Sequence, residues 1–351
     1  MNRQIDWPGL DLSKFLCVAA MIFIHAIFWL VSDHDVRIST STFVMPFIQQ
    51  SMVLGLLPLS IPITAGCMLR MHLQPYWGQP SLGDYSLIKI VGIAFFLVML
   101  GFLMNGLAFG LSSSLSWDVL QFMALSYVII AVLLKVFPVW LLAVMGVYVL
   151  LVAEFVATAW PALNNHFLLT LWFTSSPYVF WPFFPWFSVV VFGFFVAHLY
   201  LQQRALFVPV LGIASTGLVF FSVLMGDFVP ALELNNIWGS GIFQPSPVFM
   251  VGLMGFFGLL ITVSSVVMTR FFPVMSNTSL IHCYSKGILW IYVLHIIVGY
   301  RLAEWLKPLW PLSVLLMALP LFLWLMAWGI GWLNLRYFYR KKWTIVLRPI
   351  N

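Results

Sequence analysis

The chain has 351 residues, of which 63% are hydrophobic and 7% charged, and its formal net charge is +6. Its mean hydropathy is +1.04. This composition excludes a soluble globular protein and predicts an all-α polytopic membrane protein, because the apolar runs are continuous over about 20 residues and do not alternate as barrel strands do. We expect a single transmembrane domain over residues 1–351, since neither a composition break nor an internal repeat divides the chain.

The apolar runs predict about ten transmembrane helices. Their expected ranges are 10–31, 46–69, 87–109, 118–137, 138–157, 182–201, 206–226, 247–270, 287–306 and 311–335. With this count most Lys and Arg residues lie on one side, which predicts that both termini are cytoplasmic. We expect the bacterial inner membrane, with an organelle membrane as the alternative.

Basic residues gather near the end of the chain, at Arg336, Arg340, Lys341, Lys342 and Arg348. Such a cluster next to the last span predicts an anchor on anionic membrane lipid, and not a nucleic-acid site. The cysteines have neither metal-ligand nor redox spacing, so we expect small core residues and no metal.

The first span places Lys14 and His25 on either side of ten residues. On a helix they lie about 16 Å apart, half the thickness of a bilayer core. An ionisable residue inside a membrane is costly, and it therefore indicates a functional site. The alternative is a Lys14 that extends to the membrane surface and a His25 that is satisfied by a neighbouring helix.

The outer loops hold further candidates. His34 lies between Asp33 and Asp35, and a carboxylate neighbour orients a histidine as a general base, although a solvated loop of mixed charge has the same composition.

Residues 158–181 are too aromatic and too long for a simple connection, and we expect a re-entrant or interfacial segment that lines a cavity. Its Asn164 and His166, with Trp238 of the next outer loop, are candidates for binding a sugar. An interfacial aromatic belt explains the same composition.

Further polar residues lie inside predicted spans, and of these Glu154 and His295 need a partner or water. Tyr292 and His295 are three residues apart and share one helix face. Glu154 and Asp118 fall near the outer surface, where a carboxylate at a helix end is the simpler interpretation.

Several segments carry a resemblance to known membrane enzymes. Lys14 and His25 resemble the signature of the acyltransferase 3 family, an Arg or Lys, ten residues and a His. The rest of the chain is more similar to a sister branch, the heparan-α-glucosaminide N-acetyltransferase-like proteins. Six segments carry this similarity in order: IDWPGLDLSKFLCVAAMIFIHA, PLSIPITAGCML, WDVLQFMALSYVIIAVLL, FWPFFPWFSVVVFGFFVA, QPSPVFMVGLMG and SKGILWIYVLHIIV. The chain departs from the pattern where Lys14-Phe15 replaces Arg-Gly and Ala65-Gly66 replaces Ser-Gly.

The resemblance implies transfer of an acyl group, usually acetyl, from cytoplasmic acyl-CoA to a sugar hydroxyl or amine at the extracytoplasmic face. Acetyl-CoA would be the co-substrate, and a glycan or sugar the acceptor. Such a reaction requires a base, for which His25 is the first choice and His34 the second. It also requires cations for the phosphates of coenzyme A, and the basic residues placed at the cytoplasmic side are Lys14, Arg70, Lys89 and Lys286. Gly55, Gly66 and Gly92 are expected to leave space for the pantetheine arm.

A proton-coupled secondary transporter or flippase is the main alternative. It explains His295 and Glu154 as a proton relay, but it predicts inverted repeats, which the sequence lacks. A structural scaffold explains the polar residues as packing. The sequence leaves open the acceptor, the choice between O- and N-acylation, the acyl-chain length and whether the protein forms an oligomer.

Overall fold

A computed structural model describes residues 7–31, 56–76, 84–159, 171–173, 179–226, 245–272, 279–334 and 336. Their α-helices are α1 (Pro8–Val31), α3 (Ile61–Leu73), α4 (Asp84–Phe109), α5 (Val119–Val136), α6 (Val139–Ala159), α8 (Phe183–Gln202), α9 (Phe207–Leu224), α11 (Pro247–Phe271), α12 (Leu280–Leu306) and α13 (Leu312–Leu333). Between some of these α-helices lie three short 3₁₀ helices, η1 (Pro58–Ser60), η2 (Gln74–Tyr76) and η3 (Leu111–Ser113). The predicted all-α fold is confirmed.

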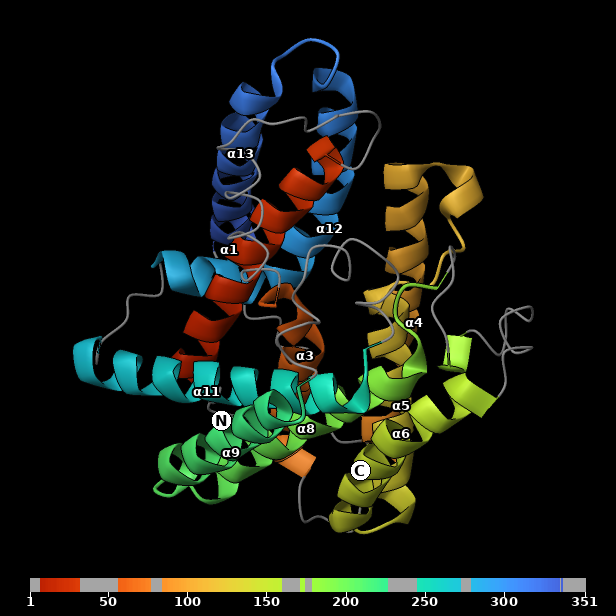
Figure 1. Ribbon diagram of the computed structural model, residues 1–351, viewed down its shortest axis with the longest axis vertical. Helices are drawn as coiled ribbons and strands as arrows, with labels where there is room; N and C mark the ends of the chain where they lie inside the picture. The colour runs from red at the N-terminus through yellow and green to blue at the C-terminus, as the bar shows by residue number, and fades with distance from the viewer. Residues whose placement is uncertain are drawn as a thin grey trace, which may run out of the picture.

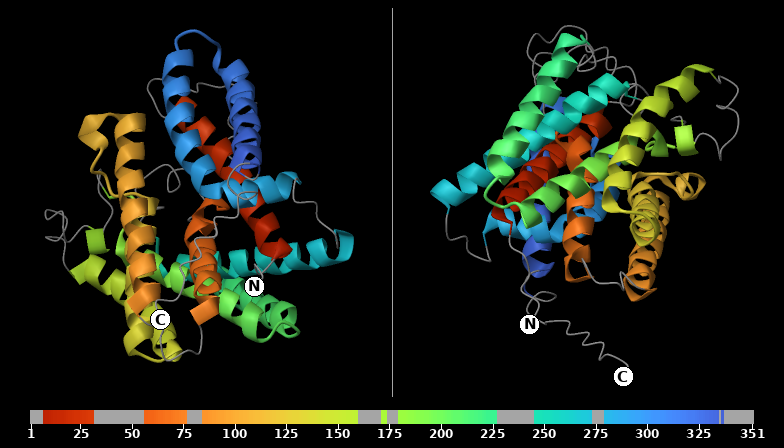
Figure 2. Two further views of the ribbon diagram at one scale, coloured as in Figure 1. Left: turned by 180° about the vertical axis from the view of Figure 1, so that it is seen from behind. Right: turned by 90° about the horizontal axis from the view of Figure 1, so that it is seen from below.

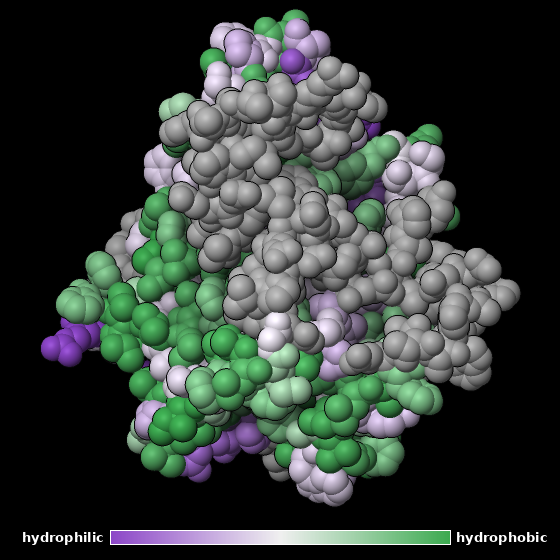
Figure 3. Space-filling model, viewed as in Figure 1, coloured by the Kyte–Doolittle hydropathy of each residue, from purple (hydrophilic) through white to green (hydrophobic). Residues whose placement is uncertain are grey.

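Within the described ranges, 8 helices are long and apolar enough to cross a membrane: α1, α4, α5, α8, α9, α11, α12 and α13. Each span expected from the sequence overlaps one of the α-helices, although α3 has only 13 residues. Large apolar side chains point outward, such as Ile88, Phe155 and Met317. Apolar residues also dominate much of the face in Figure 3, as expected for a multi-pass membrane protein in contact with lipid.

The helix α1 lies at the centre of the bundle (Figures 1 and 2). It packs against α11, α12 and α13, while α12 and α13 form an antiparallel pair. The helix α3 packs mainly on α8, α9 on α11, and α4 on α5. The polar residues Asp11, Ser13 and Lys14 of α1 are buried, so their partners must lie within the protein.

Two glycines allow α3 and α8 to cross closely. A Cβ on Gly66 would lie 2.0 Å from the Val190 carbonyl oxygen, and one on Gly193 would lie 2.1 Å from the Ile63 carbonyl oxygen. The space beside Gly66 is therefore filled by the α8 backbone, and it does not form the passage that we expected there. Among the described residues, nothing lies within 4 Å of a Cβ built on Gly92, and Gly55 lies outside the described part of the chain.

Local signals explain where the helices begin. The Ser279 hydroxyl accepts a hydrogen bond from the His282 backbone N–H at 3.2 Å, so α12 begins at Leu280 and not at the predicted residue 287. Asp118 caps α5 in a reciprocal arrangement with Gln121. Proline in the first turn of α3 starts that helix at Ile61, and residues 46–55 of the predicted span 46–69 lie outside the described chain.

Of the predicted re-entrant segment 158–181, residues 171–173 are helical and residues 179–181 lie against Trp117. The Phe180 backbone N–H donates to the Trp117 carbonyl oxygen at 3.0 Å, and the Trp117 indole N–H donates to the Trp181 carbonyl oxygen at 2.9 Å. Residues 160–170 and 174–178 lie outside the described chain.

Candidate active site

A pair of histidines joins α1 to α12. His25 Nδ1 lies 2.9 Å from His295 Nε2, and His295 Nδ1 lies 2.9 Å from the Ile291 carbonyl oxygen. His295 is fully buried, whereas His25 keeps some exposure. The structure thus brings together two of the polar residues singled out in the sequence, although 270 positions separate them.

Aromatic side chains surround this pair. The Trp29 ring lies 5.5 Å from the His25 ring and 6.0 Å from the His295 ring, measured between centroids. The Tyr292 ring lies 5.7 Å from the His295 ring in an edge contact. The Tyr292 hydroxyl donates to Asp118 Oδ2 at 3.1 Å, which connects the histidine pair to a carboxylate at the start of α5. The two imidazoles are therefore packed among aromatic side chains.

A second polar cluster joins α1 to α12 nearer their N-terminal ends. Lys14 Nζ donates to the Ser285 hydroxyl at 3.2 Å and lies 3.6 Å from Asp11 Oδ1. The Ser285 hydroxyl donates to Asp11 Oδ1, and His282 Nδ1 lies 3.7 Å from Asp11 Oδ2. Lys14 is only 2% exposed. Its charge is thus balanced inside the protein by Asp11, while the phosphate-binding role expected for Lys14 stays a prediction.

The two clusters show that α1 and α12 run parallel, because Lys14 meets Ser285 and His25 meets His295. The separations along the two helices are nearly equal, so both clusters lie on one helix–helix contact, about 15 Å apart. A buried polar interface of this kind is costly unless its groups are paired. Lys14, Asp11 and Ser285 are paired with one another, and His25 with His295, whereas His282 Nδ1 is buried without a hydrogen-bond partner among the described residues.

Arg70 occupies a third polar region, at the end of α3. Its Nε donates to His198 Nδ1 at 3.2 Å and its Nη1 donates to Gln74 Oε1 at 2.7 Å. Burial lowers the pKa of the Arg70 guanidinium to about 10, so the group stays charged at neutral pH. This residue is a fully buried cation beside a surface opening.

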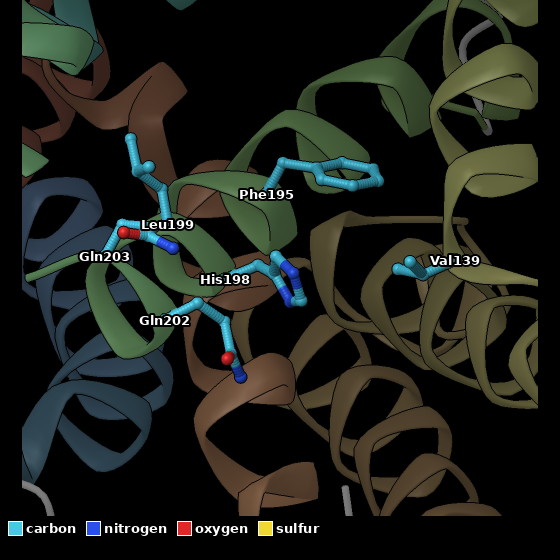
Figure 4. A pocket seen from close by; sticks show the side chains of 6 residues that line it. All are labelled: Val139, Phe195, His198, Leu199, Gln202 and Gln203. Atoms are coloured by element: carbon cyan, nitrogen blue, oxygen red, sulfur yellow. The ribbon is translucent and has the colours of Figure 1, made fainter. Parts of the chain in front are cut away.

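That opening is a cavity of about 670 Å³ at the end of α8. Figure 4 shows His198 and Gln202 projecting from α8, with Val139 opposite them on α6. Phe195, Leu199 and Gln203 complete the lining. The cavity therefore combines an imidazole and two amides with an apolar wall, and Arg70 reaches it through His198.

The other predicted site residues are scattered or not described. Lys89 is exposed on α4, and Lys286 is half-buried on α12. Glu154 lies within α6, but its side chain is outside the described part of the chain. The structure does not describe His34, Asn164, His166 and Trp238 at all, and their predicted roles stay predictions. Among the described residues, His, Cys, Asp and Glu form no cluster able to hold a metal ion.

Several residues of these clusters were not predicted as site residues, among them Asp11, Asp118 and Trp29. Asp11 stands three positions before Lys14, the spacing of an ion pair on one helix face, and this signal was available. Asp118 was interpreted as a helix-end carboxylate, which it is, but its contact with Tyr292 requires the fold. No sequence pattern distinguishes Trp29 from the many other aromatic residues of the chain.

The helices and the polar groups between α1 and α12 define a multi-pass membrane protein with a histidine pair inside its bundle. Residues 7–228, more than half of the chain, match the family model described as heparan-alpha-glucosaminide N-acetyltransferase, catalytic. The chain belongs to this family, and it is a membrane acyltransferase. The resemblance noted in the sequence is thereby confirmed. No curated protein and no solved structure matches the chain. The matched range contains His25 and Asp118 but ends before α12 and His295.

Proposed function

We propose that the protein transfers an acetyl group from cytoplasmic acetyl-CoA to an amine or hydroxyl of a sugar at the extracytoplasmic face of a bacterial inner membrane. The observation that carries the proposal is the hydrogen bond between His25 of α1 and His295 of α12, in a chain of an acetyltransferase family. An imidazole inside a helix bundle, partly accessible and hydrogen-bonded on one side, is suited to accept a proton on the other.

His25 is the proposed general base. As the acceptor oxygen or nitrogen attacks the thioester carbonyl carbon, its proton passes to the imidazole. The carbon–sulfur bond then breaks, and the imidazole returns the proton to the departing sulfur, so that free coenzyme A thiol is released. Such proton transfer contributes about 10²–10⁴-fold to the rate. His34 remains the second candidate for this role.

The polar end of the donor is proposed to bind at the cavity beside His198. Arg70 supports this proposal because it is a buried cation bonded to a residue of the cavity wall, and a guanidinium binds phosphate in a fixed geometry. Lys89 and Lys286 remain proposed contacts for further phosphate groups. For Lys14 we propose a structural role instead, because Asp11 and Ser285 already occupy its ammonium group.

The acceptor is proposed to bind at the opposite side of the bundle, where Asn164, His166 and Trp238 would contact a sugar. Amide groups supply hydrogen bonds and an indole supplies an apolar face, the two features that a sugar requires.

Sealed inside-out vesicles test the function and its direction together. Radiolabelled acetyl-CoA is added to the bath, which is the cytoplasmic face, and glucosamine is enclosed in the lumen. The proposal predicts acetylated sugar in the lumen and free coenzyme A thiol in the bath, and neither in vesicles with the His25→Ala variant. Product formed only when the sugar is in the bath would contradict the direction, and no product under either condition would contradict the acceptor class.

The same vesicles separate the enzyme from a proton-coupled transporter. A transporter moves an unmodified solute and responds to an imposed pH gradient. Uptake of unmodified sugar that depends on the gradient, without release of coenzyme A thiol, would favour that alternative.

A further inference from the structure

The hydrogen bonds around His295 determine which ring nitrogens carry protons. The Ile291 carbonyl oxygen can only accept, so His295 Nδ1, at 2.9 Å, carries a proton. A neutral imidazole has one N–H group, which leaves Nε2 of His295 as an acceptor. His25 Nδ1, at 2.9 Å from that nitrogen, must then be the donor. His25 therefore has its lone pair on Nε2.

The ring geometry agrees with this chain of hydrogen bonds. The His25 and His295 rings are parallel within 3°, and their centroids are 5.2 Å apart. With the bonded nitrogens 2.9 Å apart, the rings meet edge to edge, so that the N–H of one points along the lone pair of the other. The complete burial of His295 favours its neutral form, because an uncompensated buried charge is costly.

We propose that His295 is a positioning residue, which holds His25 in the tautomer whose Nε2 is free to accept the acceptor proton. The inference rests on the proposed function of His25 as the base. When His25 takes the proton, its Nδ1–H still donates to His295 Nε2, and the positive charge is shared by two rings in place of one. The Tyr292 ring contacts His295, and its hydroxyl group is held by a hydrogen bond to Asp118.

Two substitutions at His295 separate positioning from packing. His295→Leu removes the acceptor for His25 Nδ1–H, and we expect kcat to fall roughly 10²-fold, within the range that proton transfer contributes, while the KM for acetyl-CoA changes little. His295→Gln keeps an oxygen that accepts a hydrogen bond and should recover at least part of the turnover. Ile296→Leu, the adjacent buried residue replaced by one of equal volume, is the matched control and should behave like the wild type.

A spectroscopic measurement reads the tautomer without any assay of activity. In ¹⁵N-histidine-labelled wild-type protein, we expect His25 to show a protonated Nδ1 and an unprotonated Nε2, and His25→Gln identifies its signals. A proton on Nε2 of His25 would overturn the proposal. Equal losses of turnover in folded His295→Leu and His295→Gln would also overturn it, as would wild-type turnover in His295→Leu.

The spectrum also keeps the two proposals distinguishable. If the expected tautomer is present but no acetyl transfer occurs, the proposed function fails and the positioning of His25 stands. If transfer occurs with the other tautomer, the positioning role fails and the function stands. Should His295→Leu not fold, the wild-type spectrum still decides the question.

Discussion

Lys14 and His25 belong to one sequence signature, yet their side chains meet very different surroundings. Lys14 is buried, and its ammonium group contacts Asp11 and Ser285. His25 has one nitrogen bonded to His295 and keeps part of its surface accessible. The Asp11–Lys14–Ser285 cluster is thus a clamp between α1 and α12, whereas His25 is the residue that we propose as the base.

The clamp makes a specific prediction about stability. Lys14→Met leaves the Asp11 carboxylate buried without its cation, and breaking one side of such a pair costs about 3–5 kcal/mol. Asp11→Leu together with Lys14→Met removes both charges, and the double variant should regain most of the lost thermal stability. The measurement is the Tm of each purified variant in detergent.

Kinetics of the double variant distinguish the clamp from donor binding. We expect its KM for acetyl-CoA to stay within a few-fold of the wild-type value. A stable double variant whose donor KM has risen strongly would instead assign Lys14 to coenzyme A.

Asp118 offers a second prediction, since it both caps α5 and accepts from Tyr292. Asp118→Ala removes the cap, which should lower stability by about 0.5–2 kcal/mol, whereas Asp118→Asn keeps a capping oxygen and should cost less. Thermal unfolding of the two variants compares these costs. Equal Tm values for the two variants would show that the cap contributes nothing.

At the scale of helices, close approach between backbones decides which glycines cannot be replaced. Gly66 lies against the backbone of α8, whereas Gly92 faces open space. The sequence shows both as glycines in apolar spans, and only the packing tells them apart.

Gly66→Ala should therefore lower stability by roughly 1–3 kcal/mol, the usual cost of overpacking. Gly92→Ala is the matched control, and its stability should stay the same or rise by up to about 1 kcal/mol because alanine is the better helix former. Tm values in detergent provide the test. An unchanged Tm for Gly66→Ala, or a lowered Tm for Gly92→Ala, would contradict the close crossing of α3 and α8.

The helices were largely predictable, because long apolar runs have few other solutions. Helix α12 was predicted to begin seven residues late, since a polar first turn with His282, Ser285 and Lys286 lowers the local hydropathy even though Ser279 caps the helix. Of the site, the sequence indicated His25, Tyr292 and His295 separately. That two of them share a hydrogen bond depends on α1 lying beside α12, and nothing in the local sequence specifies that contact.

At the scale of the whole molecule, the distribution of Lys and Arg predicts which side faces the cytoplasm. Lys14, Arg70 and Lys89 all lie near the helix ends assigned to that side, as does the cavity beside His198. This distribution is why we propose that the donor enters there and that the acceptor binds opposite.

Cysteine labelling tests this orientation. In a variant with Cys17, Cys67 and Cys283 replaced, Ser32→Cys should react with an impermeant thiol reagent only from outside, and Lys341→Cys only from the cytoplasm. Reaction of both positions from the same side would contradict the predicted topology.

We propose above that His25 takes the acceptor proton. Rapid-quench measurement of a single turnover, with labelled acetyl-CoA and a saturating amino sugar, tests it most directly, because donor binding and chemistry are then separated. We predict that His25→Ala lowers the single-turnover rate about 10²-fold or more with an unchanged Kd for acetyl-CoA, and that His34→Ala does not. A His34→Ala variant without turnover, beside a His25→Ala variant that only binds or folds less well, would contradict the account.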